Sequence, residues 1–274
     1  MKLSIITLTY NNLEYTKQFI ESLFKHTKDF ELIIVDNGST DGTVEYLQSL
    51  KNIKTIFNTE NLGFSRGNNQ GIKIAEGEYI GFLNNDILLS PNWFEECEKA
   101  FKKEKVAFIS PTHINPHFHR TNSQNYLKYF KKNKPITQYT KTFDECQFSC
   151  VLTRKDILEQ IGGFDENFTP AFFEDNDLKY RAIEAGYDCF VSNTVCFYHY
   201  GSVTSAKLNH RFEENRQYYY NKHRFAEYLS IYAHENQAHR FKVRYFENFP
   251  FNYIYKLHLF KEKLIRILKR IYRI

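Results

Sequence analysis

Three groups of acidic side chains come directly after apolar segments of the chain or open a predicted helix. They are Asp36 in VDNGSTD, Asp86 in NND, and Glu174, Asp175 and Asp177 in FFEDNDLKYR. Carboxylates in such places can hold a divalent cation or act as a general base. They can equally be structural, because Asp, Asn and Ser cap helices and stabilise turns. Both interpretations stay open for each group when it is taken alone.

Asp86 favours the functional interpretation most strongly. It ends the segment NND, which follows EYIGFL, a run typical of a buried strand, so its carboxylate can hold a cation against a diphosphate. Glu174 and Asp175 can be caps stabilised by a helix dipole, and one of them can equally be a general base. His199 follows VCFY, which predicts a short strand. A single histidine is usually structural, but next to Mg²⁺ or Mn²⁺ a neutral imidazole can be a ligand.

Strands and helices that would position these side chains alternate over the first hundred residues. Short β-branched and apolar runs predict strands at residues 4–8, 32–35, 53–57 and 79–83. Helical spacings predict helices at residues 13–24 and 43–50, and a third that Ser65 caps and that runs to Ala75. Strand–helix–strand units predict an α/β fold with a mostly parallel sheet flanked by helices, whose strand ends meet at a nucleotide-binding crevice.

The second half of the chain is less regular. Pro91 is expected at the first position of another helix. Residues 111–145 are polar, basic and aromatic without a dominant period, which predicts an irregular insertion that shapes an acceptor pocket. The remaining predicted elements are strands at 106–110 and 148–153 and helices at 155–161 and 174–185.

The motifs of two other nucleotide-binding families are missing. The sequence contains no GxGxxG and no GxxxxGK[ST], which argues against a dinucleotide-binding dehydrogenase and a P-loop NTPase. What remains is metal-assisted group transfer from a nucleotide-linked donor. A sugar-1-phosphate nucleotidylyltransferase would need a glycine-rich, basic loop after the first strand, and TLTYNN is neither. A catalytically silent sugar-nucleotide-binding or scaffolding domain is the alternative from another class.

Composition and charge indicate the setting of the protein. Its five cysteines form no CxxC pair, which favours a cytoplasmic compartment, and no apolar run approaches the ~18 residues that cross a bilayer. The net charge of +5 is concentrated in residues 256–274, the basic tail, which argues against nucleic acid as a partner. The tail repeats apolar residues at spacings of three and four, which predicts an amphipathic helix. Attachment to the anionic inner face of the cell membrane is favoured over docking on the body or self-association.

Five ordered segments over roughly residues 1–205 resemble the family 2 glycosyltransferases of GT-A fold, and most of all their bacterial rhamnosyltransferase-like branch. The segments are SIITLTYNN, ELIIVDNGSTDGT, NTENLGFSRGNNQGIKIAEGEYIGFLNND, GGFDENFTPAFFEDNDLKYRAIEAGYD and FYHYGS. The resemblance implies a catalytic domain at residues 1–205, with a nucleotide-sugar-binding half at 1–110 and an acceptor-binding and catalytic half at 111–205. A helical C-terminal extension would occupy residues 206–274.

The resemblance also implies how the donor is held. Tyr10 would pack on the nucleobase and Asp36 would hydrogen-bond it. Arg66 would lie near the diphosphate, with Asn61 on the same wall, and Asn85 near the ribose.

The metal site and the base follow from the same resemblance. NND takes the place of the family's DxD motif, so Asp86 matches the metal-binding acid, while Asn84 departs from a first carboxylate. His199 matches a histidine that completes the metal site in related enzymes. Asp175 matches the base, and Glu174 would orient the acceptor or the base.

The activity implied is an inverting, Mn²⁺- or Mg²⁺-dependent glycosyltransferase that moves a hexosyl or deoxyhexosyl group. Its donor would be a UDP-, dTDP- or GDP-linked sugar, and its acceptor a glycan, a lipid-linked glycan or a protein. Synthesis of bacterial surface polysaccharide or glycoconjugate is the expected setting.

Overall fold

The computed structural model describes residues 2–102, 105–201 and 211–223. The chain divides into two compact units, residues 1–217 and 218–274, and most of the second lies outside the described residues. The amphipathic helix expected at residues 256–274 falls outside them as well. None of the helices in the described ranges is long and apolar enough to cross a membrane.

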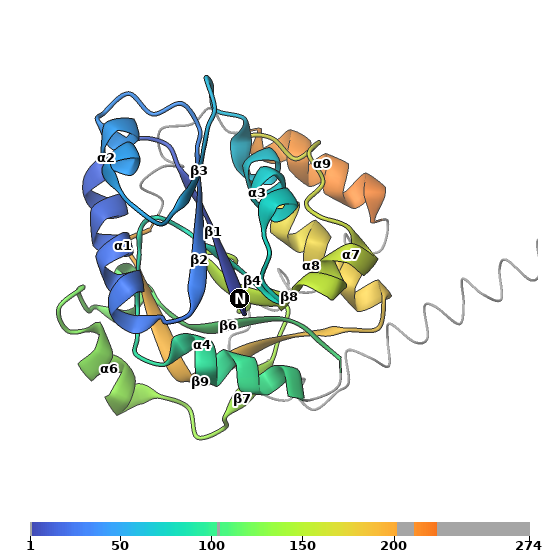
Figure 1. The fold of residues 1–274 in the computed structure, drawn as a ribbon. Helices are drawn as coiled ribbons and strands as arrows, with labels where there is room; N and C mark the ends of the chain where they lie inside the picture. Colours follow the sequence, from blue (N-terminus) through green and yellow to red (C-terminus); the bar gives the residue numbers. More distant parts are fainter. Residues whose placement is uncertain (1, 103–104, 202–210, 224–274) are drawn as a thin grey trace, which may run out of the picture. The chain divides into compact units, whose positions relative to one another are not determined.

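The first unit is built on a central sheet whose N-terminal half is parallel (Figure 1). Its apolar strands lie in the order β3 (Lys54–Phe57), β2 (Phe30–Asp36), β1 (Leu3–Thr9) and β4 (Tyr79–Leu83). Three helices connect them along the chain, α1 (Leu13–His26), α2 (Thr43–Ser49) and α3 (Gly63–Ile74). The predicted α/β fold with a parallel sheet flanked by helices is thereby confirmed.

The other half of the sheet mixes strand directions. It continues from β4 through β8 (Cys150–Arg154), β6 (Val106–Ile114), β9 (Asp188–His199) and β5 (Ile87–Leu89), and β7 (Tyr139–Lys141) also pairs with β9. Strand β8 is antiparallel to both β4 and β6, so β6 and its parallel neighbour β9 run in the same direction as β4. Strands β1, β2, β4, β6 and β9 therefore all end at one edge of the sheet, which we call the carboxyl edge.

Helices cover both faces of the sheet (Figure 1). One face packs against α1, α2 and α4 (Trp93–Glu98), and the other against α3, α7 (Lys155–Ile161) and α8 (Glu174–Glu184). Neighbouring residues of a strand serve the two layers, as Ile5 and Ile6 of β1 do. Because both faces are buried, the strands read as continuous apolar runs in the sequence.

The remaining described elements are short. A 3₁₀ turn, η1 (Lys99–Lys102), follows α4, and three further helices are α5 (Pro116–His119), α6 (Tyr126–Asn133) and α9 (Phe212–Lys222).

Two helix starts differ from the predictions. Helix α3 begins at Gly63 rather than after Ser65. The reason is that the side-chain oxygen of Asn61 accepts a hydrogen bond from the Gly63 N–H at 2.9 Å. Ser65 lies inside the first turn, where its hydroxyl donates to the Phe168 carbonyl at 3.3 Å. Helix α4 begins at Trp93, two residues after Pro91, because the intervening Asn92 has a left-handed backbone.

The prediction of an irregular insertion at residues 111–145 is wrong in part. Strand β6 continues to Ile114 because β9 is long enough to pair with it there, with Ile114 opposite Tyr198. Helix α6 follows in the same segment, and its Tyr126 and Phe130, four residues apart, are buried against Ile114 and Tyr198. That helical spacing is the signal the sequence analysis overlooked.

Candidate active site

The carboxyl edge brings Asp86 and His199 together. Strand β5 pairs with β9 so that Ile87, the residue after Asp86, lies opposite His199. The Tyr200 N–H also donates to the Asp86 carbonyl at 3.0 Å. These backbone contacts place His199 Nε2 3.1 Å from Asp86 Oδ1. The exposed fraction of the side chain is 13% for His199 and 7% for Asp86. Two residues that are 113 positions apart therefore face each other at the end of the sheet.

This pair fits part of a site for a hard divalent cation. It offers one carboxylate oxygen and one imidazole nitrogen, which suit Mn²⁺ or Mg²⁺. Within the described ranges, no group of three or more His, Cys, Asp or Glu side chains is arranged to hold a metal. A cation held by Asp86 and His199 would take its other ligands from water and from substrate phosphates, as Mg²⁺ usually does.

A second histidine, His113, lies beside this pair and was missed by the sequence analysis. Its ring centroid is 5.4 Å from that of His199, and it stacks on Phe197 at 5.0 Å. Burial lowers the pKa of His113 to about 4, with a further contribution from the neighbouring His199, so its ring is neutral near pH 7. Its Nε2 finds no hydrogen-bond partner among the residues described here. The sequence does not single out His113, because the strand that carries it extends beyond the predicted residues 106–110.

Asp36 holds together the turn between β2 and α2. Its side chain is fully buried. Its Oδ1 accepts from the N–H groups of Gly38 and Ser39 at 3.1 and 2.9 Å, and its Oδ2 accepts from the Thr9 hydroxyl at 2.8 Å and from the Ser39 hydroxyl. Both oxygens are thus engaged inside the protein, which supports the structural interpretation of VDNGSTD. A hydrogen bond from Asp36 to a nucleobase stays a prediction.

An open cavity of about 550 Å³ lies next to this turn at the carboxyl edge. It is lined by Asn11 and Asn12 of the loop after β1, by residues 13–15 at the start of α1, and by Thr40 and Asp41. Asn11 and Asn12 both have a positive φ, and Asn11 Oδ1 accepts from the Thr40 N–H at 2.8 Å. Tyr10, directly before this loop, is partly exposed. The structure therefore offers room for a ligand beside the loop that Tyr10 opens.

The other three residues predicted to bind the sugar-nucleotide donor lie in different surroundings. Asn61 closes the turn before α3, as described above. Arg66 is exposed on α3, and its Nε lies 3.6 Å from Glu166 Oε2. Asn85 is buried and donates to the Thr16 hydroxyl of α1 at 3.0 Å. Asn85 therefore links the NND segment to α1. Arg66 is the cation among the three residues, and it is accessible.

Glu174 and Asp175 open α8 in very different environments. Glu174 is 6% exposed, and its Oε2 has no hydrogen-bond partner in the described part of the chain. Burial, reinforced by the charge of Asp175, raises the pKa of Glu174 well above its usual range. The Asp175 side chain is 33% exposed. Of the two carboxyl groups, Asp175 is the one that solvent and a ligand can reach.

The loop that leads into α8 is fixed from two sides. A Cβ on Gly63, at the start of α3, would lie 2.8 Å from the Pro170 carbonyl oxygen, and its φ of +83° also requires glycine. On the other side Asn215, buried on α9, donates through Nδ2 to the Ala171 carbonyl at 2.8 Å. The position of the Glu174–Asp175 pair thus depends on α3, the helix that carries Arg66.

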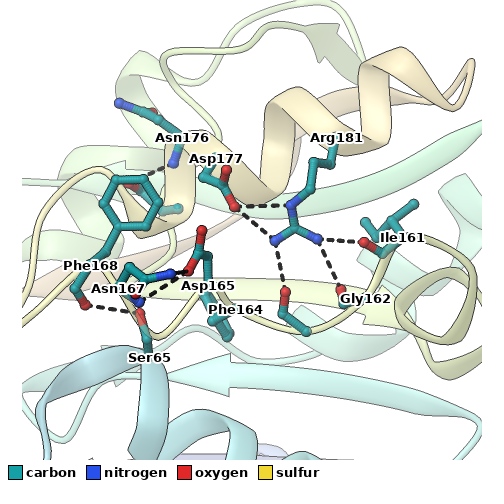
Figure 2. Close-up of polar contacts among 12 residues, drawn as sticks. Ser65, Ile161, Gly162, Phe164, Asp165, Asn167, Phe168, Asn176, Asp177 and Arg181 are labelled. Atoms are coloured by element: carbon teal, nitrogen blue, oxygen red, sulfur yellow. Dashed lines mark hydrogen bonds and ion pairs between the residues drawn. The ribbon is translucent and has the colours of Figure 1, made fainter. Parts of the chain in front are cut away.

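Asp177, the third acid of this segment, is structural (Figure 2). It is fully buried, and its Oδ2 accepts from Arg181 Nε at 2.9 Å. The same guanidinium donates to the backbone carbonyls of Ile161, Gly162 and Gly163. Asp177 and Arg181 therefore pin the turn after α7 against α8, and the carboxylate is engaged in that role.

The environment of Glu174 predicts a pH dependence of stability. Folded protein keeps the Glu174 proton to a higher pH than unfolded protein, so the free energy of unfolding falls as pH rises from about 4.5 towards the folded pKa. The loss is at most about 1.4 kcal/mol per pH unit. Glu174→Gln removes it, so the stability of the variant relative to wild type should grow from pH 5 to pH 8 in urea unfolding. Equal pH slopes for the two proteins would contradict this, and exposed Glu145→Gln is the control.

Comparison with known protein families and structures supports the fold. The family model described as glycosyl transferase family 2 matches residues 4–162. An uncharacterized glycosyltransferase of Rickettsia bellii is 28% identical over 191 residues, which is 69% of this chain and 25% of that protein. The chain thus spans about a quarter of the length of that relative.

Two solved structures share the fold. The crystal structure of GalNAc-T7 with UDP, GalNAc and Mn²⁺ has a TM-score of 0.59 at 12% identity, covering 73% of this chain and 44% of that one. Mannosyltransferase PcManGT from Pyrobaculum calidifontis, in complex with GDP-Man and Mn²⁺, has a TM-score of 0.55 at 15% identity, covering 72% and 56%. At these identities the likeness shows the GT-A type of fold alone.

Proposed function

Because the chain belongs to glycosyl transferase family 2, we propose that it moves a sugar from a nucleotide-diphosphate sugar to an acceptor hydroxyl with inversion at the anomeric carbon. The observation that supports this most is the meeting of Asp86 and His199, 3.1 Å apart, at the carboxyl edge. Parallel α/β sheets bind nucleotides at that edge.

In this proposal Asp175 is the general base. The acceptor oxygen attacks the anomeric carbon while the bond from that carbon to the diphosphate oxygen breaks, and the hydroxyl proton passes to Asp175. A nucleoside diphosphate leaves. The exposure of Asp175 supports this choice over Glu174, which is buried and whose pKa is raised by that burial. Glu174 would then orient the base or the acceptor as a hydrogen-bond donor.

Asp86 and His199 would hold a divalent cation, Mn²⁺ or Mg²⁺. When bound, such a cation supplies positive charge against the diphosphate. Tyr10 would pack on the nucleobase beside the cavity after β1, and Arg66 would approach the diphosphate from α3. The UDP and the GDP-Man bound with Mn²⁺ in the two structural relatives support a donor of this class, to which we add dTDP-linked sugars.

The acceptor is proposed to be a glycan, a lipid-linked glycan or a protein, as in the synthesis of bacterial surface glycoconjugates. Residues 111–145 would contribute to its pocket. Phe143 of this segment lies against Lys179 of α8, one turn from the proposed base, which supports that assignment.

The stereochemical part of the proposal can be tested without a known acceptor. Proton NMR of early time points, with Mn²⁺ and an α-linked sugar nucleotide that turns over with water as acceptor, should show the β-anomer of the free sugar before mutarotation. Initial release of the α-anomer would contradict the single displacement and call for a different mechanism.

A further inference from the structure

A buried lysine, Lys179, lies beside the proposed base and takes no part in the mechanism above. It follows Asp175 by one turn of α8, and its side chain is only 3% exposed. Its Nζ lies 3.8 Å from Asp175 Oδ2. Lysines usually keep their ammonium group in water, because burying a charge without compensation is costly. The burial of Lys179 therefore requires partners that compensate it.

Those partners come from the segment that leads into β8. Lys179 Nζ donates to the Phe143 carbonyl at 3.1 Å and lies 4.6 Å from the centre of the Phe143 ring. The Phe148 ring is 5.9 Å away. A carbonyl and two aromatic rings stabilise a cation but do not neutralise it. Asp175 is the only carboxylate within ion-pair distance of Lys179 in the described part of the chain.

Other titratable groups lie near this pair. Glu174 is buried, and burial raises its pKa well above its usual range, which favours its neutral form. Cys146 and Cys189 are buried free thiols, and the hydrogen bond with Cys189 and the charge of Lys179 lower the pKa of Cys146 despite its burial. Asp175 is the carboxylate that faces Lys179 at ion-pair distance.

We infer that Lys179 is a positioning residue for the proposed base, which it holds in one orientation at the start of α8. It touches no reacting atom in this scheme. Its second contact, to Phe143, couples that orientation to the segment proposed to receive the acceptor. The inference rests on the proposed function, because it assigns Lys179 a role only through Asp175.

The test compares kcat and donor KM of wild type and Lys179 variants. Lys179→Met keeps an unbranched apolar stem against the two rings but removes the charge, so kcat should fall by about tenfold or more with donor KM unchanged. Lys179→Arg should recover most of the rate, because it keeps a cation there.

A second variant separates charge from hydrogen bonding and guards against a folding failure. Lys179→Gln can still donate to the Phe143 carbonyl but carries no charge, so it should lose rate as Lys179→Met does. Lys155→Met is the matched control, because Lys155 also donates to a backbone carbonyl, that of Ala75 at 2.9 Å, away from the carboxyl edge. A normal kcat in folded Lys179→Gln or Lys179→Met would overturn the inference.

A double variant distinguishes this inference from the proposed function. If Lys179 acts through Asp175, adding Lys179→Met to Asp175→Asn should cause no further loss of rate. Independent, multiplicative losses would overturn the inference. If Asp175→Asn alone transfers sugar normally, the proposed function fails instead. If Asp175→Asn is impaired and Lys179→Met is not, only the role of Lys179 is wrong.

Discussion

Asp175→Asn is expected to lower the rate of sugar transfer by at least ~100-fold while nucleotide affinity stays at the wild-type level. The amide has nearly the shape of the carboxylate, so α8 and its contacts should persist. It cannot accept the acceptor proton, which is the step assigned to this residue. The exposed position of Asp175 means that the substitution places no new unpaired group in the core.

The measurement is kcat for the favoured sugar nucleotide together with the dissociation constant of its nucleoside diphosphate. Asp156→Asn is the matched control, because Asp156 is an exposed carboxylate in the first turn of another helix, α7. Near-normal turnover by Asp175→Asn would show that Asp175 is not the general base. A loss confined to nucleotide affinity would move Asp175 into the donor site instead.

Asp86→Ala is expected to abolish metal-dependent nucleotide binding, and His199→Ala to weaken it less. The carboxylate supplies negative charge to a hard cation, while the imidazole supplies only a neutral lone pair. Because the two side chains are 3.1 Å apart and little exposed, each variant removes one side of the same site.

Isothermal titration with Mn²⁺, and then with UDP, dTDP and GDP in its presence, measures this effect without any turnover. Asp156→Ala is the control, since Asp156 is an exposed carboxylate at the start of α7. Nucleotide binding and turnover that are unchanged by EDTA would show that neither requires a divalent cation. Equal losses in the two variants would contradict the unequal roles given to the carboxylate and the imidazole.

The sequence predicts well those elements whose signal is local. Strand β4 and helix α7 occur at the predicted residues, because an apolar run between turn residues and a helical spacing are each complete within a few residues. Helix α8 also begins at the predicted Glu174.

Elements that depend on distant partners could not be predicted in this way. Strand β6 extends to Ile114 and β9 is much longer than the short strand expected, because each supplies the other's hydrogen bonds. Strand β5, which was not predicted, is the strand that brings Asp86 to His199. The family resemblance paired these two residues, but the sequence alone gives no reason for their contact.

Local patterns also fail to separate buried polar residues from exposed ones. Asp36 and Asp175 both lie among turn or cap residues in the sequence. Asp36 is nevertheless buried and hydrogen-bonded, whereas Asp175 is accessible. Lysines usually keep their charged end in solvent. Lys179 is buried instead, because Phe143 and Phe148 reach it from a segment more than thirty positions away. Such burial follows from tertiary packing, which residue type does not encode.

The most direct test of the whole account measures nucleotide binding and nucleoside diphosphate release in the same samples. Wild-type protein is incubated with Mn²⁺ and a panel of UDP-, dTDP- and GDP-linked sugars, beside Asp175→Asn and an EDTA-treated sample. We expect wild type to release the diphosphate from at least one donor and EDTA to stop the release. Asp175→Asn should bind the same nucleotide but release the diphosphate at least ~100-fold more slowly. Binding without release by the wild-type protein would contradict the account and identify a silent sugar-nucleotide-binding domain.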